Sequence, residues 1–390
     1  MLHQTHVIIN LENIYRNLEQ IKNLVSPRRK ILLAVKSNGY GLGAIPVALM
    51  SERHSLVDWF GVTTVPEGID LRTAGVRLPI LKLSPTFQEE MFEAINNNLT
   101  LTVCDLSNIA IIQKICHSQH IKYPVHLKID TGLGRFGVNP YEAPNLAVYI
   151  EKSCPNLLLE GIFTQMADGR SPQGTQFTEK QITIFRQTID NIKTTIGRTP
   201  DLIHCANSSV IFNQTEDSWF SMVRIGQAAY GGCSWNKANN VHLNLSNGLI
   251  SFCTRVSFLK KVSKGTNVGY RQDWTASDDC WIATLPVGYT DGFNRHFSNR
   301  GRVLINGESY PIVGIIGMNQ CMANLGKETT VQVGDEVVLI GRSGNNIITV
   351  DEWVKILDST QNEVICQINP HLPRIYLGFE NLVGGGLAFS

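Results

Sequence analysis

The residues with the most chemical potential are a lysine and the glycine-punctuated loop that follows it, within residues 34–43. The residues before Lys36, Ile31 to Val35, are apolar and partly β-branched, which is typical of a buried parallel strand. Desolvation at the end of such a strand makes a lysine amine a nucleophile that can form a Schiff base with an aldehyde. The alternative is a solvated lysine at a strand end.

The loop after Lys36 contains Gly39, Gly41 and Gly43, with Tyr40 between the first two. Glycine lets the backbone turn closely around a ligand, and a tyrosine hydroxyl can donate to a phosphate. The loop is therefore a candidate phosphate-binding segment beside Lys36.

Two further segments carry candidate binding groups. Lys128 and Arg135 flank a glycine-rich strand end, where a basic pair can hold a phenolate oxygen or a carboxylate. The alternative for Arg135 is a structural ion pair with Asp130.

A phosphate site is predicted farther along the chain. Asn207 and Ser208 follow the seventh predicted strand and Gly226 follows the eighth, where barrels commonly bind phosphate with backbone amides and a hydroxyl. Helix capping is the alternative, and the two roles can coexist. Arg224 lies inside the eighth strand and has no evident structural reason there.

The composition limits the classes of protein that the chain can represent. A chain of 390 residues with 43% hydrophobic content and a net charge of +1 predicts two ordinary globular domains and no nucleic-acid partner. The nine cysteines, from Cys104 to Cys366, never form a CxxC pair, so we expect neither disulfides nor a metal site. Without a signal-like N-terminus or a long apolar run, we expect a cytoplasmic protein with no membrane association.

Strands and helices alternate over the first part of the chain. Asn10 is a candidate cap for a helix whose apolar residues recur from Leu11 to Val25, and another helix has one apolar face from Phe177 to Ile192. The eight predicted strands are Ile31–Lys36, Trp59–Thr63, Ile80–Ser84, Leu99–Cys104, Pro124–Asp130, Leu158–Phe163, Leu202–Cys205 and Met222–Gln227. This α/β pattern predicts a (β/α)₈ TIM barrel whose site lies at the C-terminal ends of the strands.

From about residue 240 the pattern changes to short strands split by turn residues, which predicts a C-terminal, mostly-β domain. Its predicted strands are Trp281–Val287, Val303–Asn306, Ile312–Ile316 and Glu336–Ile340. We therefore expect a barrel over residues 9–238 and a β domain over 239–390, with residues 1–8 joining the β domain as a strand.

Taken together, these segments resemble the alanine racemases, a family of pyridoxal-phosphate enzymes built from a barrel and a β domain. The resemblance covers essentially the whole chain and is carried by residues 34–43, 126–137, 204–208, 222–226, 268–270, 285–292 and 311–322. It implies pyridoxal 5'-phosphate as cofactor and a small amino acid as substrate. By default the reaction is L-alanine to D-alanine, and its physiological role stays open between peptidoglycan precursor supply, resistance and catabolism.

The resemblance assigns roles to the barrel residues. Lys36 binds the cofactor and acts as the base on one face of the substrate, and Arg135 contacts both cofactor and substrate. Arg224 faces the pyridine nitrogen and keeps it unprotonated, which favours racemisation over transamination. Lys128 is a candidate for carbamylation, which would brace Arg135.

The β domain supplies the remaining roles. Tyr270 matches the base for the second face, and in the family it reaches the cofactor of the partner subunit, so a homodimer with shared sites is expected. Tyr289 would narrow the entrance, and Met318 would offer its backbone amide to the substrate carboxylate. Without the resemblance, each tyrosine could equally be a packing residue.

Several matched positions depart from the family pattern. Gln165 replaces a histidine that usually hydrogen-bonds the catalytic tyrosine, and glutamine cannot titrate. Gly317 and Asn319 replace cysteine and aspartate, and Ile315 replaces an entrance arginine, so the substrate corridor has lost charge.

Asn362 occupies the place of a tyrosine that crowds the substrate methyl group in alanine enzymes. Asparagine enlarges the pocket and offers an amide to a hydroxyl, as in serine-preferring members of the family. The alternative for this residue is an exposed loop asparagine with no ligand role. If Asn362 does contact the substrate, the alternative function for the protein is a serine or broad-specificity racemase.

Two other functions stay open. A decarboxylase of the related barrel class also uses a lysine after Ala-Val, although Arg224 argues against it because such an enzyme needs a carboxylate on the pyridine nitrogen. A non-catalytic pyridoxal-phosphate carrier would resemble only the first domain, but Gln165 and Asn319 keep a degenerate enzyme possible.

Overall fold

The computed structural model describes residues 4–25, 29–168, 172–213, 216–231 and 243–379. The chain forms two compact units. The barrel unit comprises Ile14–Gly39 and Ala44–Ser246, and the β unit comprises Met1–Asn13, Tyr40–Gly43 and Asn247–Ser390. The expected domain boundary between residues 238 and 239 lies outside the described residues.

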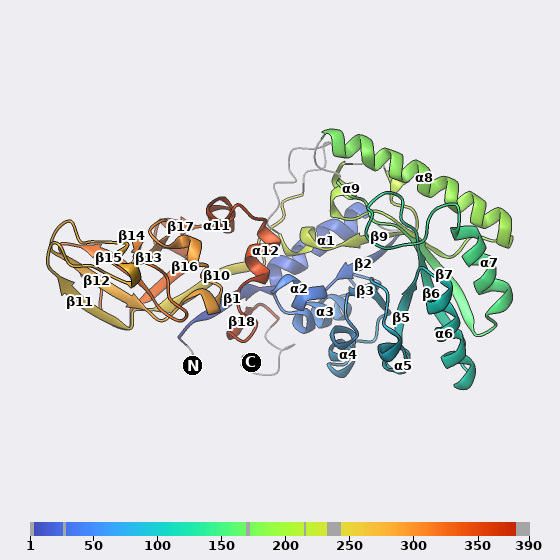
Figure 1. Ribbon diagram of the computed structural model, residues 1–390, viewed down its shortest axis with the longest axis horizontal. Helices are drawn as coiled ribbons and strands as arrows, with labels where there is room; N and C mark the ends of the chain where they lie inside the picture. The colour runs from blue at the N-terminus through green and yellow to red at the C-terminus, as the bar shows by residue number, and fades with distance from the viewer. Residues whose placement is uncertain (1–3, 26–28, 169–171, 214–215, 232–242, 380–390) are drawn as a thin grey trace. The chain divides into compact units, whose positions relative to one another are not determined.

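The barrel unit contains one parallel sheet of eight strands, which confirms the predicted (β/α)₈ architecture (Figure 1). The strands are β2 (Lys30–Ala34), β3 (Trp59–Val62), β4 (Ile80–Lys82), β5 (Leu99–Val103), β6 (Tyr123–Lys128), β7 (Leu157–Phe163), β8 (Leu202–His204) and β9 (Met222–Ile225). Each strand pairs with the next from β2 to β8, and β9 pairs with β2. Most side chains on both faces are buried and apolar, as in parallel sheets covered by helices, with Lys82, His126, Lys128, His204 and Arg224 among the buried polar exceptions.

The seam between β8 and β9 has no regular ladder of hydrogen bonds. Two backbone bonds join its sides instead, from Ser221 N to Ile203 O at 3.2 Å and from Arg224 N to Ala206 O at 2.8 Å. The sheet is therefore a nearly closed barrel, and Arg224 lies at its one irregular seam among the described strands.

Helices lie on the outside of this sheet (Figure 1). They are α3 (Ala44–Arg53), α4 (Val65–Thr73), α5 (Gln88–Asn96), α6 (Leu106–Ser118), α7 (Ala143–Ser153), α8 (Pro172–Ile196), α9 (Ser208–Asn213) and α10 (Gln227–Tyr230). The predicted first helix is α1 (Leu11–Val25), and Asn10 Oδ1 caps it by accepting from Asn13 N at 3.1 Å. Within the described ranges, no helix is both long and apolar enough to cross a membrane.

The β unit is a mostly antiparallel sheet in the order β11-β12-β15-β14-β13-β16-β10-β1-β18, with β17 paired to β16. Its strands are β1 (His6–Asn10), β10 (Leu249–Arg255), β11 (Phe258–Val262), β12 (Cys280–Leu285), β13 (Arg302–Ile305), β14 (Glu308–Val313), β15 (Cys321–Gly326), β16 (Glu336–Ser343), β17 (Asn346–Ile348) and β18 (Arg374–Leu377). Strand β1, from the N-terminal end of the chain, lies between β10 and β18.

One predicted strand of the β unit is displaced in the structure. We expected Ile312–Ile316, but β14 spans Glu308–Val313. It ends early because Gly314 turns to φ +73°, and Asn299 Oδ1 accepts from the Gly314 amide at 2.6 Å. It begins early because Asn306 and Gly307, at φ +51° and +84°, form a tight hairpin turn with β13.

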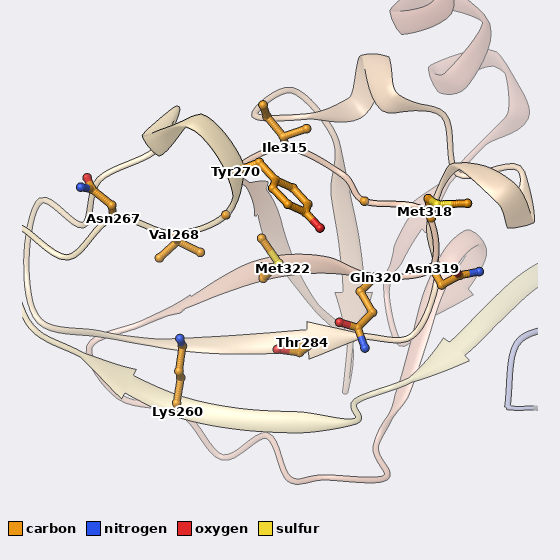
Figure 2. A pocket seen from close by; sticks show the side chains of 12 residues that line it. Lys260, Asn267, Val268, Tyr270, Thr284, Ile315, Met318, Asn319, Gln320 and Met322 are labelled. Atoms are coloured by element: carbon orange, nitrogen blue, oxygen red, sulfur yellow. The ribbon is translucent and has the colours of Figure 1, made fainter.

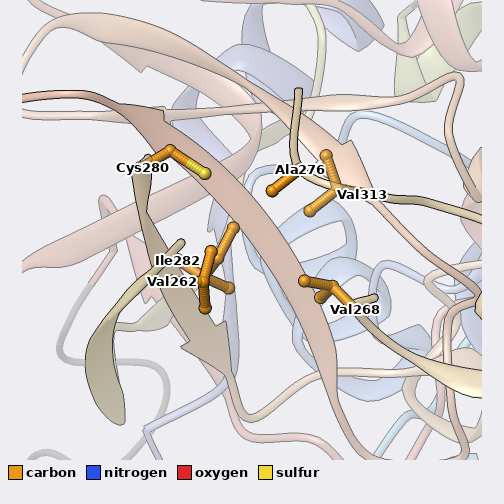
Figure 3. Packing of buried hydrophobic residues seen from close by; sticks show 6 residues of the cluster. All are labelled: Val262, Val268, Ala276, Cys280, Ile282 and Val313. Carbon is orange, nitrogen blue, oxygen red and sulfur yellow. The ribbon is translucent and has the colours of Figure 1, made fainter. Parts of the chain in front are cut away.

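The core of the β unit has two parts. Figure 3 shows the cluster of Val262, Val268, Ala276, Cys280, Ile282 and Val313. The second part surrounds Trp353 of α11 (Val350–Leu357), whose ring centroid lies 5.4 Å from that of Phe293 and 4.5 Å from that of Phe297. The Trp353 indole N–H donates to Leu339 O at 3.1 Å. These contacts attach α11 to the sheet and to the segment of Phe293 and Phe297.

Arg374 is a buried cation in the β unit whose described hydrogen bonds all go to backbone carbonyls. Its guanidinium donates to the carbonyl oxygens of Gly41, Ile368, Asn369, Pro370 and Leu372, at 2.9 to 3.3 Å. Burial lowers the pKa of Arg374, because the charged form has lost water. The planar guanidinium can satisfy five acceptors at once, which the single ammonium of lysine cannot.

We therefore expect Arg374→Lys to destabilise the β unit by about 3 kcal/mol, because it leaves buried carbonyls without donors. Urea denaturation followed by tryptophan fluorescence measures this loss. The matched control is Arg255→Lys, since Arg255 is exposed on β10 and, among the residues that the structure describes, donates only to Gly334 O at 3.2 Å. Equal stability of the two variants would contradict the expectation.

Candidate active site

Lys36 lies at the C-terminal end of β2, as predicted, and its side chain is half-buried. The preceding residue continues the sheet, because Val35 N donates to Gly61 O at 2.9 Å on β3. On the other side, Tyr230 at the end of α10 donates its hydroxyl to Ala34 O at 2.9 Å. The backbone that leads to Lys36 is therefore tied to both neighbouring parts of the barrel.

The segment after Lys36 is a left-handed turn rather than an open glycine loop. In α2 (Lys36–Tyr40), Ser37, Asn38 and Gly39 have φ/ψ values near +53°/+49°, +52°/+48° and +61°/+46°, and Tyr40 has φ +57°. Each such non-glycine residue costs roughly 1 kcal/mol, so a run of them needs outside support. The sequence analysis missed this strain, although the Asn-Gly pair is a local signal for positive φ.

Part of that support is local. Gly39 N donates to Val35 O at 2.7 Å, and Asn38 Oδ1 accepts from Ala44 N at 2.9 Å. A Cβ atom on Gly39 would lie 3.0 Å from Ala44 N, so only glycine fits at that position. The remaining support comes from Glu67, which is treated below.

Arg224 lies within β9, as predicted, and is only 6% exposed. Its Nη1 donates to His204 O at 2.9 Å and to His204 Nδ1 at 3.2 Å. Its Nη2 donates to the carbonyls of Thr164 and Cys205 at 2.8 and 3.2 Å, and to Gln165 Oε1 at 3.1 Å. Among the described residues, Nε donates to no acceptor and stays available for a ligand.

A chain of hydrogen bonds leads from Arg224 to the barrel's outer side. His204 Nδ1 accepts from Arg224, so its proton lies on Nε2, which donates to His126 Nδ1 at 3.0 Å. His126 Nε2 then donates to Glu160 Oε2 at 3.4 Å. Burial lowers the pKa of both imidazoles, so both are neutral and every proton points away from the arginine.

The predicted phosphate-binding groups converge where β8 and β9 end. Ser208 Oγ accepts from the amides of Gly226 and Ala228, both at 3.4 Å. A hydroxyl and two backbone N–H groups are thus gathered at one point, as an anion site requires. Asn207 caps α9, since its Oδ1 accepts from Ser209 Oγ at 2.6 Å and from Val210 N at 3.1 Å.

Lys128 is a buried cation, 2% exposed, at the end of β6. Its Nζ lies 3.5 Å from the centroid of the Phe136 ring and makes no hydrogen bond within the described part of the chain. Burial, followed by the positive charges of Arg135 and Arg224, lowers its pKa to about 7.

Arg135 is exposed beside Lys128, and the alternative of an ion pair with Asp130 is not what the structure has. The Asp130 carboxylate instead accepts from the backbone amides of Gly132, Leu133 and Gly134 at 2.9 to 3.2 Å. Three cations, Lys128, Arg135 and Arg224, therefore share the mouth of the barrel, which favours an anionic ligand.

In the β unit, Tyr270 and Met318 line one cavity of about 640 Å³. Figure 2 shows the Tyr270 ring beside Ile315 and Met322, with Met318 and Asn319 on the neighbouring loop. Tyr270 and Met318 are 70% and 58% exposed, although they are large apolar side chains. Ile315, Gly317 and Asn319, the residues that depart from the family pattern, also line this cavity.

Tyr289 adjoins this cavity through the backbone. Its amide donates to Gly317 O at 3.1 Å, and the amide and hydroxyl of Thr290 donate to Met318 O at 3.1 and 2.8 Å. A Cβ atom on Gly288 would lie 2.2 Å from Met318 O, so the two loops touch without space for a side chain. The structure thus brings Tyr270, Tyr289 and Met318 together on one surface.

Asn362 belongs to a helix, α12 (Gln361–Cys366), and is half-buried, so it is not an exposed loop residue. The end of this helix lies against the loop of Tyr40, because a Cβ atom on Gly41 would approach Ile365 O to 2.8 Å. Burial, followed by the Cys366 thiol, raises the pKa of Tyr40 to about 12. Tyr40 therefore stays protonated and can donate to a phosphate.

Pyridoxal phosphate fits the donors of the barrel unit. The paired strands β2 and β9 present Lys36 and the available Nε of Arg224, and Ser208, Gly226 and Ala228 supply donors for a phosphate. Together, fold and site define a barrel enzyme for an anionic ring cofactor, with an antiparallel β domain in the same chain.

Comparisons with known proteins agree. The N-terminal domain of alanine racemases matches residues 9–234, and the C-terminal domain matches residues 249–376. The alanine racemase of Cutibacterium acnes is 38% identical over 374 residues, covering 96% of this chain and 98% of that protein. That of Treponema denticola is 37% identical over 380 residues, with coverage of 96% and 98%.

A solved alanine racemase from Clostridium difficile superposes with a TM-score of 0.89 at 33% identity, covering 97% of this chain and 96% of that one. The chain therefore belongs to the alanine racemase family, whose members are pyridoxal-phosphate-dependent isomerases. The family resemblance drawn from the sequence is confirmed.

The sequence analysis missed several residues around the site. Glu67, His126, His204, Glu160 and Tyr230 support Lys36 or Arg224 through hydrogen bonds. The two histidines lie inside segments that carry the family resemblance, so their positions were a usable signal. Glu67 and Tyr230 had no such signal in the sequence, because only the fold brings Glu67 to the start of α2 and Tyr230 to the end of β2.

The lowered pKa of Lys128 predicts a pH dependence of stability. An unfolded lysine keeps its proton up to a pH of about 10.5, whereas the buried amine loses it near pH 7, so stability rises as the pH increases above 7. In buffers free of carbon dioxide, Lys128→Met should reduce this rise by up to about 1.4 kcal/mol per pH unit. Denaturant titrations at pH 7, 8 and 9 measure it, and parallel pH profiles for the two proteins would refute it.

Proposed function

We propose that the protein racemises a small amino acid with pyridoxal phosphate, with alanine as the default substrate. The observation that carries the proposal is Arg224, a buried cation with its Nε available, on the strand that pairs with the strand of Lys36. A permanent cation on the pyridine nitrogen favours racemisation over transamination and decarboxylation. The bound cofactor would supply an electrophilic aldehyde carbon and a ring that acidify the α-proton of the amino acid.

The residues of this chain divide the remaining tasks. Lys36 Nζ would hold the cofactor through its aldehyde carbon, and it exchanges a proton at the α-carbon on one face of the substrate. The Tyr270 hydroxyl exchanges a proton on the opposite face. Tyr40, Ser208 and Gly226 bind the phosphate, and Asn207 shapes that site by capping α9.

In the homodimer proposed below, substrate binding uses Arg135 of one subunit together with Met318 and Tyr289 of its partner. Arg135 and the backbone amide of Met318 orient the substrate carboxylate, and Tyr289 narrows the entrance. A carbamylated Lys128 would turn a buried cation into an anion between two arginines. Its pKa of about 7 supports this, because only a neutral amine reacts with carbon dioxide.

We further propose a cytoplasmic homodimer in which Tyr270 completes the site of the partner subunit. The exposure of Tyr270, Met318 and Tyr289, at 70%, 58% and 44%, supports an interface, because large apolar side chains gathered on one surface favour a partner. The eight described cysteines are free thiols, which supports a reducing compartment. In this scheme residues 9–238 form the cofactor domain and 239–390 the β domain.

The proposal is tested by proton exchange at the α-carbon in deuterated water, followed by NMR with L-alanine and D-alanine. Lys36→Ala should abolish the Schiff-base absorbance and lower exchange about a thousandfold, since it removes a general base and the cofactor anchor. Tyr270→Phe should retain exchange with one enantiomer but stop formation of the other, because Lys36 still serves its own face.

Tyr141→Phe is the matched control, because Tyr141 is 75% exposed and lies outside the site. It should behave as the wild type. Carbon dioxide release by the wild-type protein would instead indicate a decarboxylase. Cofactor binding without exchange of any small amino acid would indicate a non-catalytic carrier.

A second candidate function is serine or broad-specificity racemisation, favoured by Asn362. This asparagine is half-buried on α12, whose end contacts the loop of the phosphate ligand Tyr40. Compared with a tyrosine ring, an amide at this position leaves space for the hydroxymethyl group of serine and can hydrogen-bond it.

We therefore expect Asn362→Tyr to lower the ratio of serine to alanine racemisation about tenfold, because the ring fills the space of the hydroxyl. Paired kcat/KM measurements with both amino acids give the ratio. Asn145→Tyr, at an exposed position on α7, is the matched control and should leave the ratio unchanged. A ratio insensitive to Asn362→Tyr would remove serine specificity from the proposal.

A further inference from the structure

The left-handed turn after Lys36 needs support from outside its own residues, and Glu67 provides it. Ser37 is the first residue of the turn, and its amide donates to Glu67 Oε1 at 2.5 Å. Since Ser37 directly follows Lys36, this bond fixes the peptide unit that carries the lysine into the turn.

The second carboxylate oxygen of Glu67 is held by another part of the barrel. Glu67 Oε2 accepts from Thr63 N at 2.9 Å, from Thr64 N at 3.1 Å and from Thr63 Oγ1 at 3.3 Å. These bonds arise because Glu67 is the third residue of α4, where it closes a capping box with Thr64. The carboxylate is thereby rigid before it meets Ser37.

The four partners of Glu67 are all donors, so both of its oxygens must accept. An ion pair with Lys82 does not explain the residue, because among the described residues the Lys82 ammonium binds oxygens of Ser84 and Pro85 instead. An ordinary capping box needs only one carboxylate oxygen. The second oxygen is directed at the turn of Lys36.

We propose that Glu67 is a positioning residue that clamps the strained turn and thereby sets the direction of the Lys36 side chain at the mouth of the barrel. The assignment rests on the proposed function of Lys36 as cofactor anchor and base. Displacement of a reacting group by about 1 Å can lower a rate about a hundredfold, so loss of the Glu67 contact with this turn should lower the rate of the reaction at Lys36.

Glu67→Gln is the sharpest test, because the amide has the same size but can accept on one side only. In the full-length protein, with and without cofactor, amide hydrogen exchange at Ser37 should accelerate at least about tenfold. In the racemisation assay, kcat should fall about tenfold while KM changes little, because the lysine is misplaced rather than the substrate site lost.

Thr64→Ala is the matched control. It removes the hydroxyl that accepts from Glu67 N at 3.3 Å and weakens the same helix start, but it keeps the carboxylate on Ser37. We expect Ser37 exchange and kcat to stay near the wild-type values in this variant. Equal acceleration of exchange in both variants would assign the effect to helix capping and overturn the proposal.

The remaining outcomes separate the clamp from the function. Unchanged Ser37 exchange in Glu67→Gln would overturn the clamp, and faster exchange with unchanged kcat would overturn its role in positioning Lys36. If the wild-type protein forms no Schiff-base absorbance at Lys36, the proposed function fails. The exchange comparison still decides in that case whether Glu67 holds the turn.

Discussion

The guanidinium of Arg224 joins the two sides of the barrel seam, and the rest of the site depends on it. Strands β8 and β9 have no regular ladder, and the carbonyls of Thr164, His204 and Cys205 accept from side-chain donors here, His204 O in addition to the Thr164 amide. The terminal nitrogens of Arg224 supply them, and His204 and His126 fix the arginine further. The same contacts that complete the barrel therefore orient Nε as the remaining donor. One side chain can bind both the seam and a ligand because the guanidinium has five N–H donors, and the seam occupies only those on the terminal nitrogens.

Strain and uncompensated charge are concentrated at the same end of the barrel. The turn after Lys36 is left-handed over consecutive residues, and Lys128 is a buried cation without a hydrogen-bond partner among the described residues. Both features lower the stability of the folded chain, and both are retained where ligands bind. An anionic cofactor and an anionic substrate group would relieve the mutual repulsion of Lys128, Arg135 and Arg224. The electrostatics of this end of the barrel therefore favour an anionic ligand.

Much of the fold could be predicted from sequence because its periodicities are strong. The apolar runs at Ile31 and Met222 are buried on both faces, and helix α1 begins at its Asn10 cap. Elements with weak patterns were missed or displaced. Strand β14 ended early because Gly314 and Asn299 made a tertiary hydrogen bond, and β18 was not expected because its partner strand β1 and the Gly41 carbonyl bound by Arg374 lie far away in the sequence.

The sequence by itself determined the family, the barrel and the candidate residues Lys36, Arg224 and Tyr270, because local order along the chain carries motifs and periodicity. Only the tertiary structure decided how these residues are held. Glu67 accepts from the Ser37 amide, Asn207 caps α9, and Asp130 accepts from backbone amides instead of pairing with Arg135. The physical reason is that a side chain's partner depends on which donors and acceptors the fold leaves unsatisfied nearby, and spacing along the chain does not encode that distance.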